Sequence, residues 1–291
     1  MEDAQRDSTQ NAKATLYGLL AVLLWSTVAT AFKLALESLA IAQLLLLATG
    51  FSWLVFALTF VITRPPALTG RDHAYCLLLG LLNPCLYYLV LFAAYDRLPA
   101  HIAQPLNYTW AITLALLAIP ILKQRLTGRA LGGILVSYTG VVILLNPGSN
   151  EAASLNWFGV ALALGSTLIW ATYWLLNTKR PTDPIATMFF SFTYALPIVA
   201  TICHLGPGIR TPTLPELGYG MWAGLVEMGI TFLLWQRALK LTDSAARISQ
   251  LIFLSPFLSL VIIHYVLGET IGWTAIVGLA VIVIGLLIKD R

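Results

Sequence analysis

Long apolar stretches, separated by short polar segments, follow one another along the whole chain. Ten of them lie between the charged positions, and each approaches or exceeds the roughly 20 residues that a helix needs to cross the hydrocarbon core of a bilayer. They cover residues 14–32, 38–63, 73–95, 98–122, 130–150, 152–178, 184–209, 217–236, 248–268 and 270–288. The pattern predicts an all-α integral membrane protein with ten transmembrane helices.

Composition strengthens this prediction. Hydrophobic residues make up 58% of the chain and charged residues 10%, whereas soluble domains carry about 25% charged residues. The connecting segments are too short to hold a soluble domain. Residues 1–13 are polar and mixed in charge, and they resemble a short disordered tail more than the basic start of a cleavable signal peptide. We expect a second short tail at 289–291.

The lysines and arginines are unevenly distributed between the two sides of this arrangement. Fourteen lie on one side, and only Lys33, Arg97 and Arg210 lie on the other. Cytoplasmic loops of membrane proteins carry an excess of Lys and Arg, so both termini are predicted to be cytoplasmic. The basic pI therefore follows from topology, and no nucleic-acid partner is expected.

The chain contains a weak internal repeat. A displacement of 145 residues superposes several identical residues, and the pairs are Trp25 and Trp170, Thr27 and Thr172, Gly133 and Gly278, and Gly140 and Gly285. It predicts two five-helix units, 14–145 and 157–288, joined by a periplasmic loop at 146–156. Because five crossings are an odd number, the second unit is inverted, as in transporters that bind substrate where two such units meet.

Helix-breaking residues mark where such a site would lie. Asn83 and Pro84 interrupt the third stretch, and the displacement of 145 residues carries them to Met228 and Gly229 in the eighth. Proline also interrupts the fourth and ninth stretches, though not at equivalent positions. The predicted helix breaks are Asn83, Pro84, Pro105, Gly229 and Pro256.

Glu227 is an acid in the middle of the eighth stretch. A carboxylate at the bilayer centre costs at least about 2.5 kcal/mol, so we expect Glu227 to face a cavity. The alternative is a protonated Glu227 that is hydrogen-bonded to a neighbouring helix. The predicted substrate-binding residues are Tyr87, Asn107, Tyr108, Trp110, Trp170, Trp174 and Glu227.

The aromatic residues have a second interpretation, because Trp and Tyr also gather at membrane interfaces. Trp157 and Trp273 lie near the ends of stretches and fit that role, whereas Tyr87 and Trp110 lie near the middle. For Trp25, Trp170 and Trp174, cavity lining and helix packing remain equally open. Phe32 is expected to pack or face lipid, and His101 to be solvated.

Several segments resemble one known family. The stretches "LLWSTVATAFK", "GSTLIWATYW" and "LGETIGWTAIVGLAVIVIGLLI" are similar to the EamA branch of the drug/metabolite transporter (DMT) superfamily, whose halves end in Gly-Glu and a glycine-spaced helix. In the first half Lys123-Gln124 replaces Gly-Glu. The segment "NYTWAITLALLAIPILKQRLT" resembles the YddG-type exporters of aromatic amino acids.

The resemblance implies a secondary transporter of the bacterial inner membrane that exports aromatic and other neutral amino acids, or related small metabolites, by alternating access. An exporter of lipophilic drugs or cations is the alternative. An intramembrane enzyme is a more distant one, because the stretches lack a catalytic constellation. The sequence contains no motif for a cofactor or metal, and it leaves the oligomeric state open.

Overall fold

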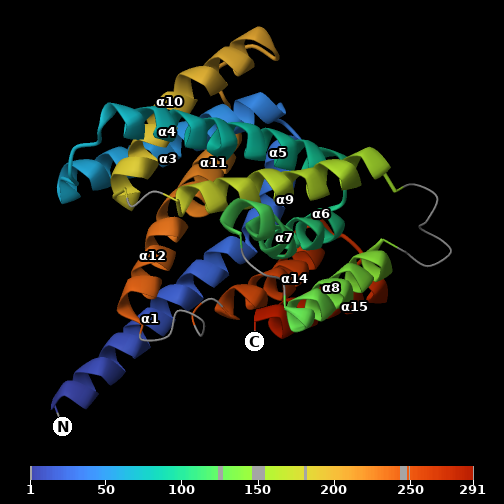
Figure 1. The fold of residues 1–291 in the computed structure, drawn as a ribbon. Helices are drawn as coiled ribbons and strands as arrows, with labels where there is room; N and C mark the ends of the chain where they lie inside the picture. Colours follow the sequence, from blue (N-terminus) through green and yellow to red (C-terminus); the bar gives the residue numbers. More distant parts are fainter. Residues whose placement is uncertain are drawn as a thin grey trace.

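The computed structural model describes residues 2–123, 127–145, 155–179, 182–242, 248 and 250–290, and these residues form helices without a strand (Figure 1). The elements of the first half are α1 (Glu2–Ser26), α2 (Val28–Leu36), α3 (Ile41–Thr63), α4 (Gly70–Gly80), η1 (Leu81–Leu86), α5 (Tyr87–Arg97), α6 (Ala100–Tyr108), α7 (Trp110–Leu122) and α8 (Gly128–Leu144). Those of the second half are α9 (Trp157–Asn177), α10 (Pro184–Leu205), α11 (Leu214–Trp222), η3 (Ala223–Ile230), α12 (Thr231–Leu241), η4 (Leu251–Leu254), α14 (Ser255–Leu267) and α15 (Trp273–Asp290).

Seven helical segments of the described chain are long and apolar enough to cross a membrane. They are Gln10–Leu36, Ile41–Thr63, Gly70–Arg97, Ala100–Ile121, Trp157–Asn177, Pro184–Leu205 and Leu214–Leu241. Three shorter apolar helices are Gly128–Leu144, Leu251–Leu267 and Trp273–Ile288. Each segment overlaps one predicted stretch, so the all-helical class is confirmed. The number of crossings and the side of the termini stay predictions.

Two parts of the predicted domain layout can be compared with the structure, namely the N-terminal tail at 1–13 and the connecting loop at 146–156. Helix α1 begins at Glu2, so the stretch expected to be a disordered tail continues the first helix. Most of the connecting loop, residues 146–154, lies outside the described residues.

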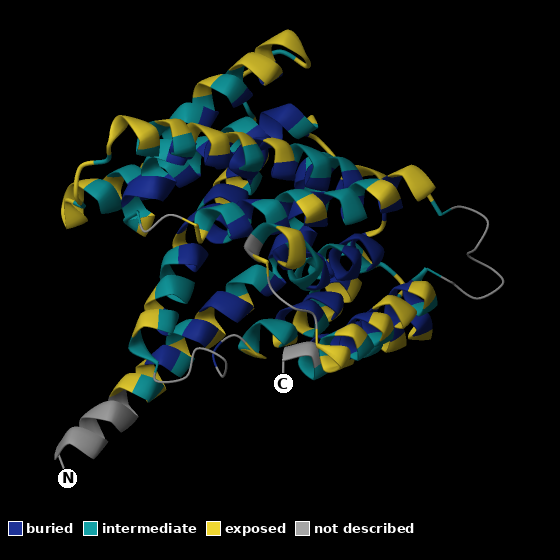
Figure 2. Ribbon diagram, viewed as in Figure 1, coloured by how far each residue is buried: buried dark blue, intermediate teal, exposed yellow. Residues whose placement is uncertain are grey.

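Large apolar side chains cover the outside of the helix bundle, where Figure 2 shows many exposed positions. Ile62 and Val142 are 70% and 67% exposed, for example. Apolar surface of this kind is costly in water and neutral in lipid. Trp157 and Trp273, the first residues of α9 and α15, are also exposed, as expected for aromatic residues at an interface.

Helices α8 and α15 lie side by side and run in opposite directions (Figure 1). A Cβ atom at Gly140 would lie 2.6 Å from the carbonyl oxygen of Gly278, and one at Gly285 would touch the carbonyl oxygen of Gly133. Later residues of α8 therefore contact earlier residues of α15, as expected for an antiparallel pair. Glycines permit this close approach because no side chain separates the two backbones.

The centre of this crossing contains a contact between equivalent positions of the two halves. The Ser137 hydroxyl donates a hydrogen bond of 3.0 Å to the carbonyl oxygen of Ile282, which lies 145 residues further along the chain. This separation equals the displacement of the sequence repeat. Other helices pair in the same way, since α1 packs against α12 and its counterpart α9 packs against α5.

The third and eighth segments both depart from α-helical geometry near their middle. At Asn83 the backbone dihedrals are −142° and 117°, and the peptide bond to Pro84 is cis. The π-helical segment η1 contains this departure. The eighth segment contains the π-helical segment η3, which includes Glu227 and Gly229.

The fourth segment is interrupted later than the sequence predicted. Helix α6 continues through Pro105 and ends at Tyr108, and α7 begins at Trp110. Between them, the hydroxyl and the N–H of Thr109 donate to the carbonyl oxygen of Leu106, at 2.7 and 3.2 Å. A Thr side chain that bonds to the preceding turn competes with the helical ladder, so the break follows Thr109 instead of the proline.

The ninth segment is interrupted at the equivalent place. The 3-10 helix η4 leads into α14 at Ser255, which is separated from Trp110 by the repeat displacement of 145 residues. Pro256 lies in the first turn of α14, where its missing N–H leaves no helical bond unmade. The expectation of non-equivalent breaks at Pro105 and Pro256 is therefore wrong, because the prolines do not mark the exact positions.

Glu269, between α14 and α15, holds the N-terminus of α6. Its carboxylate accepts hydrogen bonds from the backbone N–H groups of Ala100 (2.8 Å) and His101 (3.1 Å), and it lies 2.6 Å from His101 Nδ1. Burial alone would raise the pKa of Glu269, but these hydrogen bonds lower it. His101 is therefore paired and largely buried, contrary to the expectation of a solvated side chain.

We predict that Gly140→Leu destabilises the protein and that Gly132→Leu, on the same helix, does not. A side chain at Gly140 collides with the backbone of α15, whereas one at Gly132 meets nothing within 4 Å. Overpacking costs about 1–3 kcal/mol, or roughly 2–4 °C of melting temperature per kcal/mol. Thermal unfolding in detergent measures the difference, and equal melting temperatures for the two variants would contradict this packing.

We also predict that Glu269→Gln lowers stability at neutral pH, by about 1–2 kcal/mol, because a charge-assisted cap becomes a neutral one. A carboxyl whose folded pKa is lowered stabilises the fold above its ordinary pKa of about 4.3, and that stabilisation is lost as the pH falls through the folded value. Melting temperatures of the wild type should therefore fall towards those of the variant in acid. Parallel curves at all pH values would argue against the cap.

Candidate functional site

A cavity of about 230 Å³ lies between the two halves of the chain. Seventeen residues line it, and ten of them are aromatic. The substrate-binding residues predicted from the sequence all belong to its wall, namely Tyr87, Asn107, Tyr108, Trp110, Trp170, Trp174 and Glu227. The predicted helix breaks Asn83, Pro84, Pro105, Gly229 and Pro256 do not belong to the wall.

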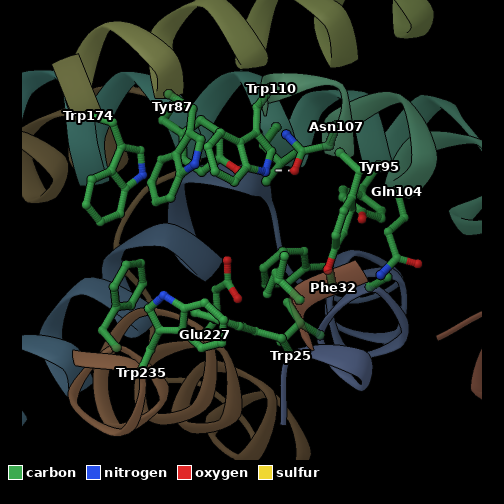
Figure 3. Close-up of a pocket in the computed structure, with 17 residues that line it drawn as sticks. Trp25, Phe32, Tyr87, Tyr95, Gln104, Asn107, Trp110, Trp174, Glu227 and Trp235 are labelled. Atoms are coloured by element: carbon green, nitrogen blue, oxygen red, sulfur yellow. Dashed lines mark hydrogen bonds between the residues drawn. The ribbon is translucent and has the colours of Figure 1, made fainter. Parts of the chain in front are cut away.

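The wall consists of two facing rows of side chains (Figure 3). One row includes Trp174, Tyr87 and Trp110, and the opposite row includes Trp235 and Trp25. The carboxylate of Glu227 points from the second row into the open space between them. A molecule in this space would touch aromatic rings on both sides and the acid on one.

Two ring contacts across the cavity wall are equivalent under the repeat. Tyr87 stacks on Trp170 with ring centroids 4.5 Å apart and an interplanar angle of 28°. Trp25 meets Phe232 edge-on at 5.8 Å and 86°. Both Trp25 and Trp170, and both Tyr87 and Phe232, are separated by 145 residues. An aromatic pair therefore occurs at both sets of equivalent positions, stacked in one case and edge-on in the other.

The polar groups of the wall do not follow this symmetry. Asn107 corresponds to Ile252, which also lines the cavity, and Glu227 corresponds to Leu82, which does not. The counterpart of Trp174 under the repeat is the much smaller Ala29, which also lines the cavity. The two halves therefore contribute equivalent positions to the cavity wall, but the side chains at these positions differ in chemistry.

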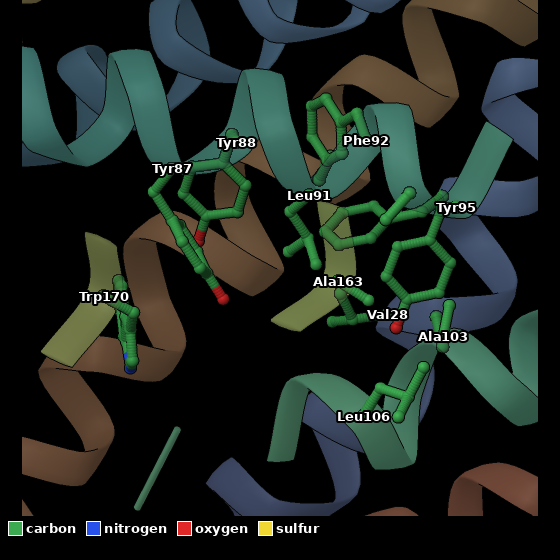
Figure 4. Packing of buried hydrophobic residues seen from close by; sticks show 14 of the residues in the cluster. Val28, Tyr87, Tyr88, Leu91, Phe92, Tyr95, Ala103, Leu106, Ala163 and Trp170 are labelled. Carbon is green, nitrogen blue, oxygen red and sulfur yellow. The ribbon is translucent and has the colours of Figure 1, made fainter. Parts of the chain in front are cut away.

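The side chain of Glu227 lies between the cavity and a neighbouring helix. It lines the cavity, and its Oε1 accepts a hydrogen bond of 3.0 Å from the hydroxyl of Tyr88 on α5. Tyr88 is completely buried, among the rings seen in Figure 4. A rigid, buried donor of this kind fixes the direction of the carboxylate.

Asn107 also has its side chain held by neighbours. Its Oδ1 accepts from the hydroxyl of Tyr87 at 3.3 Å, and its Nδ2 donates to the hydroxyl of Ser166 at 3.0 Å. By contrast, Gln104 Oε1 and Trp174 Nε1 have no hydrogen-bond partner among the described residues. A buried polar atom left unpaired costs about 1–3 kcal/mol, which a ligand with matching groups would recover.

Lys33, the basic residue of α2, is not among the residues that line the cavity. Lys33 follows the lining residue Phe32, and its ammonium donates to the carbonyl oxygens of Tyr95 (2.8 Å) and Leu98 (3.0 Å). It thereby caps the C-terminal end of α5, where a positive charge is favourable. Among the seventeen lining residues Glu227 is the only acid, and Lys, Arg and His are absent.

Sequence reasoning missed several residues of the wall. Phe32 lines the cavity, so its assignment to packing or lipid is incomplete, and Trp25 lines it as well. Tyr95, Gln104, Phe232 and Trp235 were not identified at all. The repeat offered a signal for Phe232, because it is the counterpart of Tyr87. The described residues contain no cluster of His, Cys, Asp or Glu suited to a metal.

Known proteins share both the fold and the sequence pattern. A crystal structure superposes with a TM-score of 0.66, at 21% identity, over 95% of this chain and 97% of the other. An uncharacterized transporter of Clostridium kluyveri is 25% identical over 289 residues, covering 95% of this chain and 93% of the relative.

Two further relatives carry names that include a substrate. The aromatic amino acid exporter YddG of Ancylobacter novellus is 24% identical over 250 residues, covering 80% of this chain and 81% of the relative. The "Probable terminal-alkyne amino-acid exporter" of Streptantibioticus cattleyicolor is 24% identical over 286 residues, covering 96% and 94%. Residues 12–146 and 157–288 each match the EamA-like transporter family. The chain therefore belongs to the EamA-like transporters, membrane proteins of the DMT superfamily.

Proposed function

We propose that this protein exports small neutral and aromatic amino acids across the bacterial inner membrane, by alternating access of a central cavity to the two sides. Ten crossings form two inverted five-helix halves, and both termini are cytoplasmic. The observation that carries the proposal is the cavity itself, which is enclosed by aromatic rings from both halves and contains one carboxylate.

The inverted arrangement has support from three directions. The family matches twice, once in each half. Helices α8 and α15, which are equivalent under the repeat, run antiparallel, and Ser137 contacts its own counterpart Ile282. The bias of Lys and Arg towards one side agrees with an odd number of crossings in each half. In transporters of this design, rocking of one half against the other exposes the site alternately.

Amino acids suit the cavity in size and chemistry. Its volume of about 230 Å³ lies below the roughly 300–1,000 Å³ of pockets for drug-sized ligands. An apolar or aromatic side chain can stack on Tyr87 and Trp170, as these rings stack on each other. The amino group can approach Glu227. The names of two relatives favour the same class of substrate.

A lipophilic cation is the second candidate substrate. The favouring observation is that Glu227 stands without a basic residue on the wall, among several indole rings. Aromatic faces attract cations, most strongly where water is excluded. A drug-sized cation would, however, need a larger cavity than the one present here.

We predict that proteoliposomes containing the protein exchange radiolabelled Phe, Trp or Thr in counterflow, and that Trp170→Ala slows this exchange about tenfold or more, the equivalent of 1.4 kcal/mol. The variant loses the ring that stacks on Tyr87. Trp157→Ala is the matched control, because that indole is exposed at a helix end. Exchange of a lipophilic cation without any amino acid would favour the second candidate instead.

A separate prediction concerns coupling to protons. If Glu227 carries the proton, exchange by Glu227→Gln no longer responds to a pH gradient, even at a substrate concentration high enough to offset weaker binding of the amino group. The measurement is substrate flux in proteoliposomes with and without an imposed gradient. Gradient-driven flux that is the same in wild type and variant would eliminate Glu227 as the proton carrier.

A further inference from the structure

The charges around the cavity are unevenly matched to an amino acid. A zwitterion brings one positive and one negative group, but the wall carries a single acid and no basic residue. The nearby cation, Lys33, is already engaged with the carbonyl oxygens of Tyr95 and Leu98. A charge that leaves water without a counter-charge is strongly disfavoured. The wall therefore compensates the ammonium and leaves the carboxylate without a countercharge.

The direction of Glu227 strengthens this asymmetry. Tyr88 donates to Oε1 from its buried position on α5, and among the described residues Oε2 has no hydrogen-bond partner. The carboxylate faces the open space of the cavity in Figure 3. An ammonium there would gain a charge-assisted hydrogen bond, and a ligand carboxylate in the same place would be repelled.

Aromatic rings around the acid add to the preference for a cation. Trp25, Trp235 and Tyr87 belong to the same wall as Glu227, and Trp25 lies 5.4 Å from Trp235 between ring centroids. The faces of such rings carry partial negative charge and attract ammonium groups. They provide no comparable attraction for an anion.

The hydrogen-bond donors that the wall offers to a ligand carboxylate are indole N–H groups, tyrosine hydroxyls and the amides of Gln104 and Asn107. One amide hydrogen of Asn107 is engaged with Ser166, and the indole N–H of Trp174 has no partner among the described residues. All of these donors are neutral. Neutral donors bind an anion less strongly than a guanidinium or an ammonium does.

We propose that this protein recognises the ammonium group and the aromatic ring of its substrate, and does not require the carboxylate. Its substrates then extend to aromatic amines without a free carboxylate, such as arylalkylamines and carboxyl-esterified aromatic amino acids. The inference rests on the proposed transport through this cavity, and it assigns to Glu227 the role of the specificity-determining residue.

Competition against radiolabelled phenylalanine in proteoliposome counterflow tests the proposal, with four compounds that share one ring. These are phenylalanine, its methyl ester, 2-phenylethylamine and N-acetylphenylalanine, in which the amine is blocked. The ester and the amine should compete at concentrations no higher than phenylalanine needs, and N-acetylphenylalanine should need at least about tenfold more. Direct counterflow of radiolabelled 2-phenylethylamine should follow the same order.

Variants connect the preference to the acid. Glu227→Gln should weaken binding of 2-phenylethylamine about tenfold or more, while binding of N-acetylphenylalanine changes little. Glu227→Asp keeps the charge and should retain the order of the four compounds. Trp157→Ala is the control, because that residue is exposed at a helix end and does not line the cavity, so the order of the four compounds should not change. Thermal unfolding verifies that each variant is folded.

The outcomes distinguish failure of this inference from failure of the proposed transport function. If N-acetylphenylalanine competes as well as phenylalanine while the ester and the amine fail, the carboxylate is the recognised group, and this inference is overturned although amino-acid transport stands. If Glu227→Gln leaves the order of compounds unchanged, the assignment to Glu227 is overturned. If none of the four compounds binds or moves, the proposed function itself fails.

Discussion

Backbone N–H and C=O groups inside a bilayer must find partners within the protein, and this constraint determines where a membrane protein can hold an irregular helix. Here the third, fourth, eighth and ninth helical segments all depart from regular geometry, at η1, Thr109, η3 and η4. All four departures lie beside one cavity, where the two halves of the chain cover each other. Residues in or next to each departure line the cavity, namely Tyr87 after η1, Tyr108 and Trp110 around Thr109, Glu227 in η3 and Ile252 in η4.

The repeat explains the shape of the cavity, and the residue differences between the two halves explain its chemistry. Close antiparallel packing of α8 on α15 joins the halves through glycines, and the aromatic contact of Trp170 with Tyr87 recurs as that of Trp25 with Phe232. At other equivalent positions the residues have changed, as with Asn107 and Ile252. The two halves therefore share a frame but present different side chains to the cavity.

Two acids near helix ends lie against basic side chains, whereas the acid at the centre of the cavity does not. Glu269 is paired with His101, and Arg210 with Glu216, in segments beyond or at the ends of the helices. At the centre, the partner of Glu227 among the described residues is the neutral hydroxyl of Tyr88. An acid without a paired cation acts more strongly on a charged group in a low-dielectric interior than it would in water.

The sequence by itself determined the helical class, the apolar segments, the 145-residue repeat and seven of the residues that line the cavity, because hydrophobicity and periodicity are properties of the chain alone. It failed where the outcome depends on neighbours. The break after Thr109 is decided by a side chain bonding to its own turn, and the prolines nearby gave the wrong position. The place of Phe32 and Trp235 on the wall, and the pairing of His101 with Glu269, needed the tertiary structure. Only the folded chain brings residues more than a hundred positions apart within hydrogen-bond distance, and no local pattern encodes such contacts.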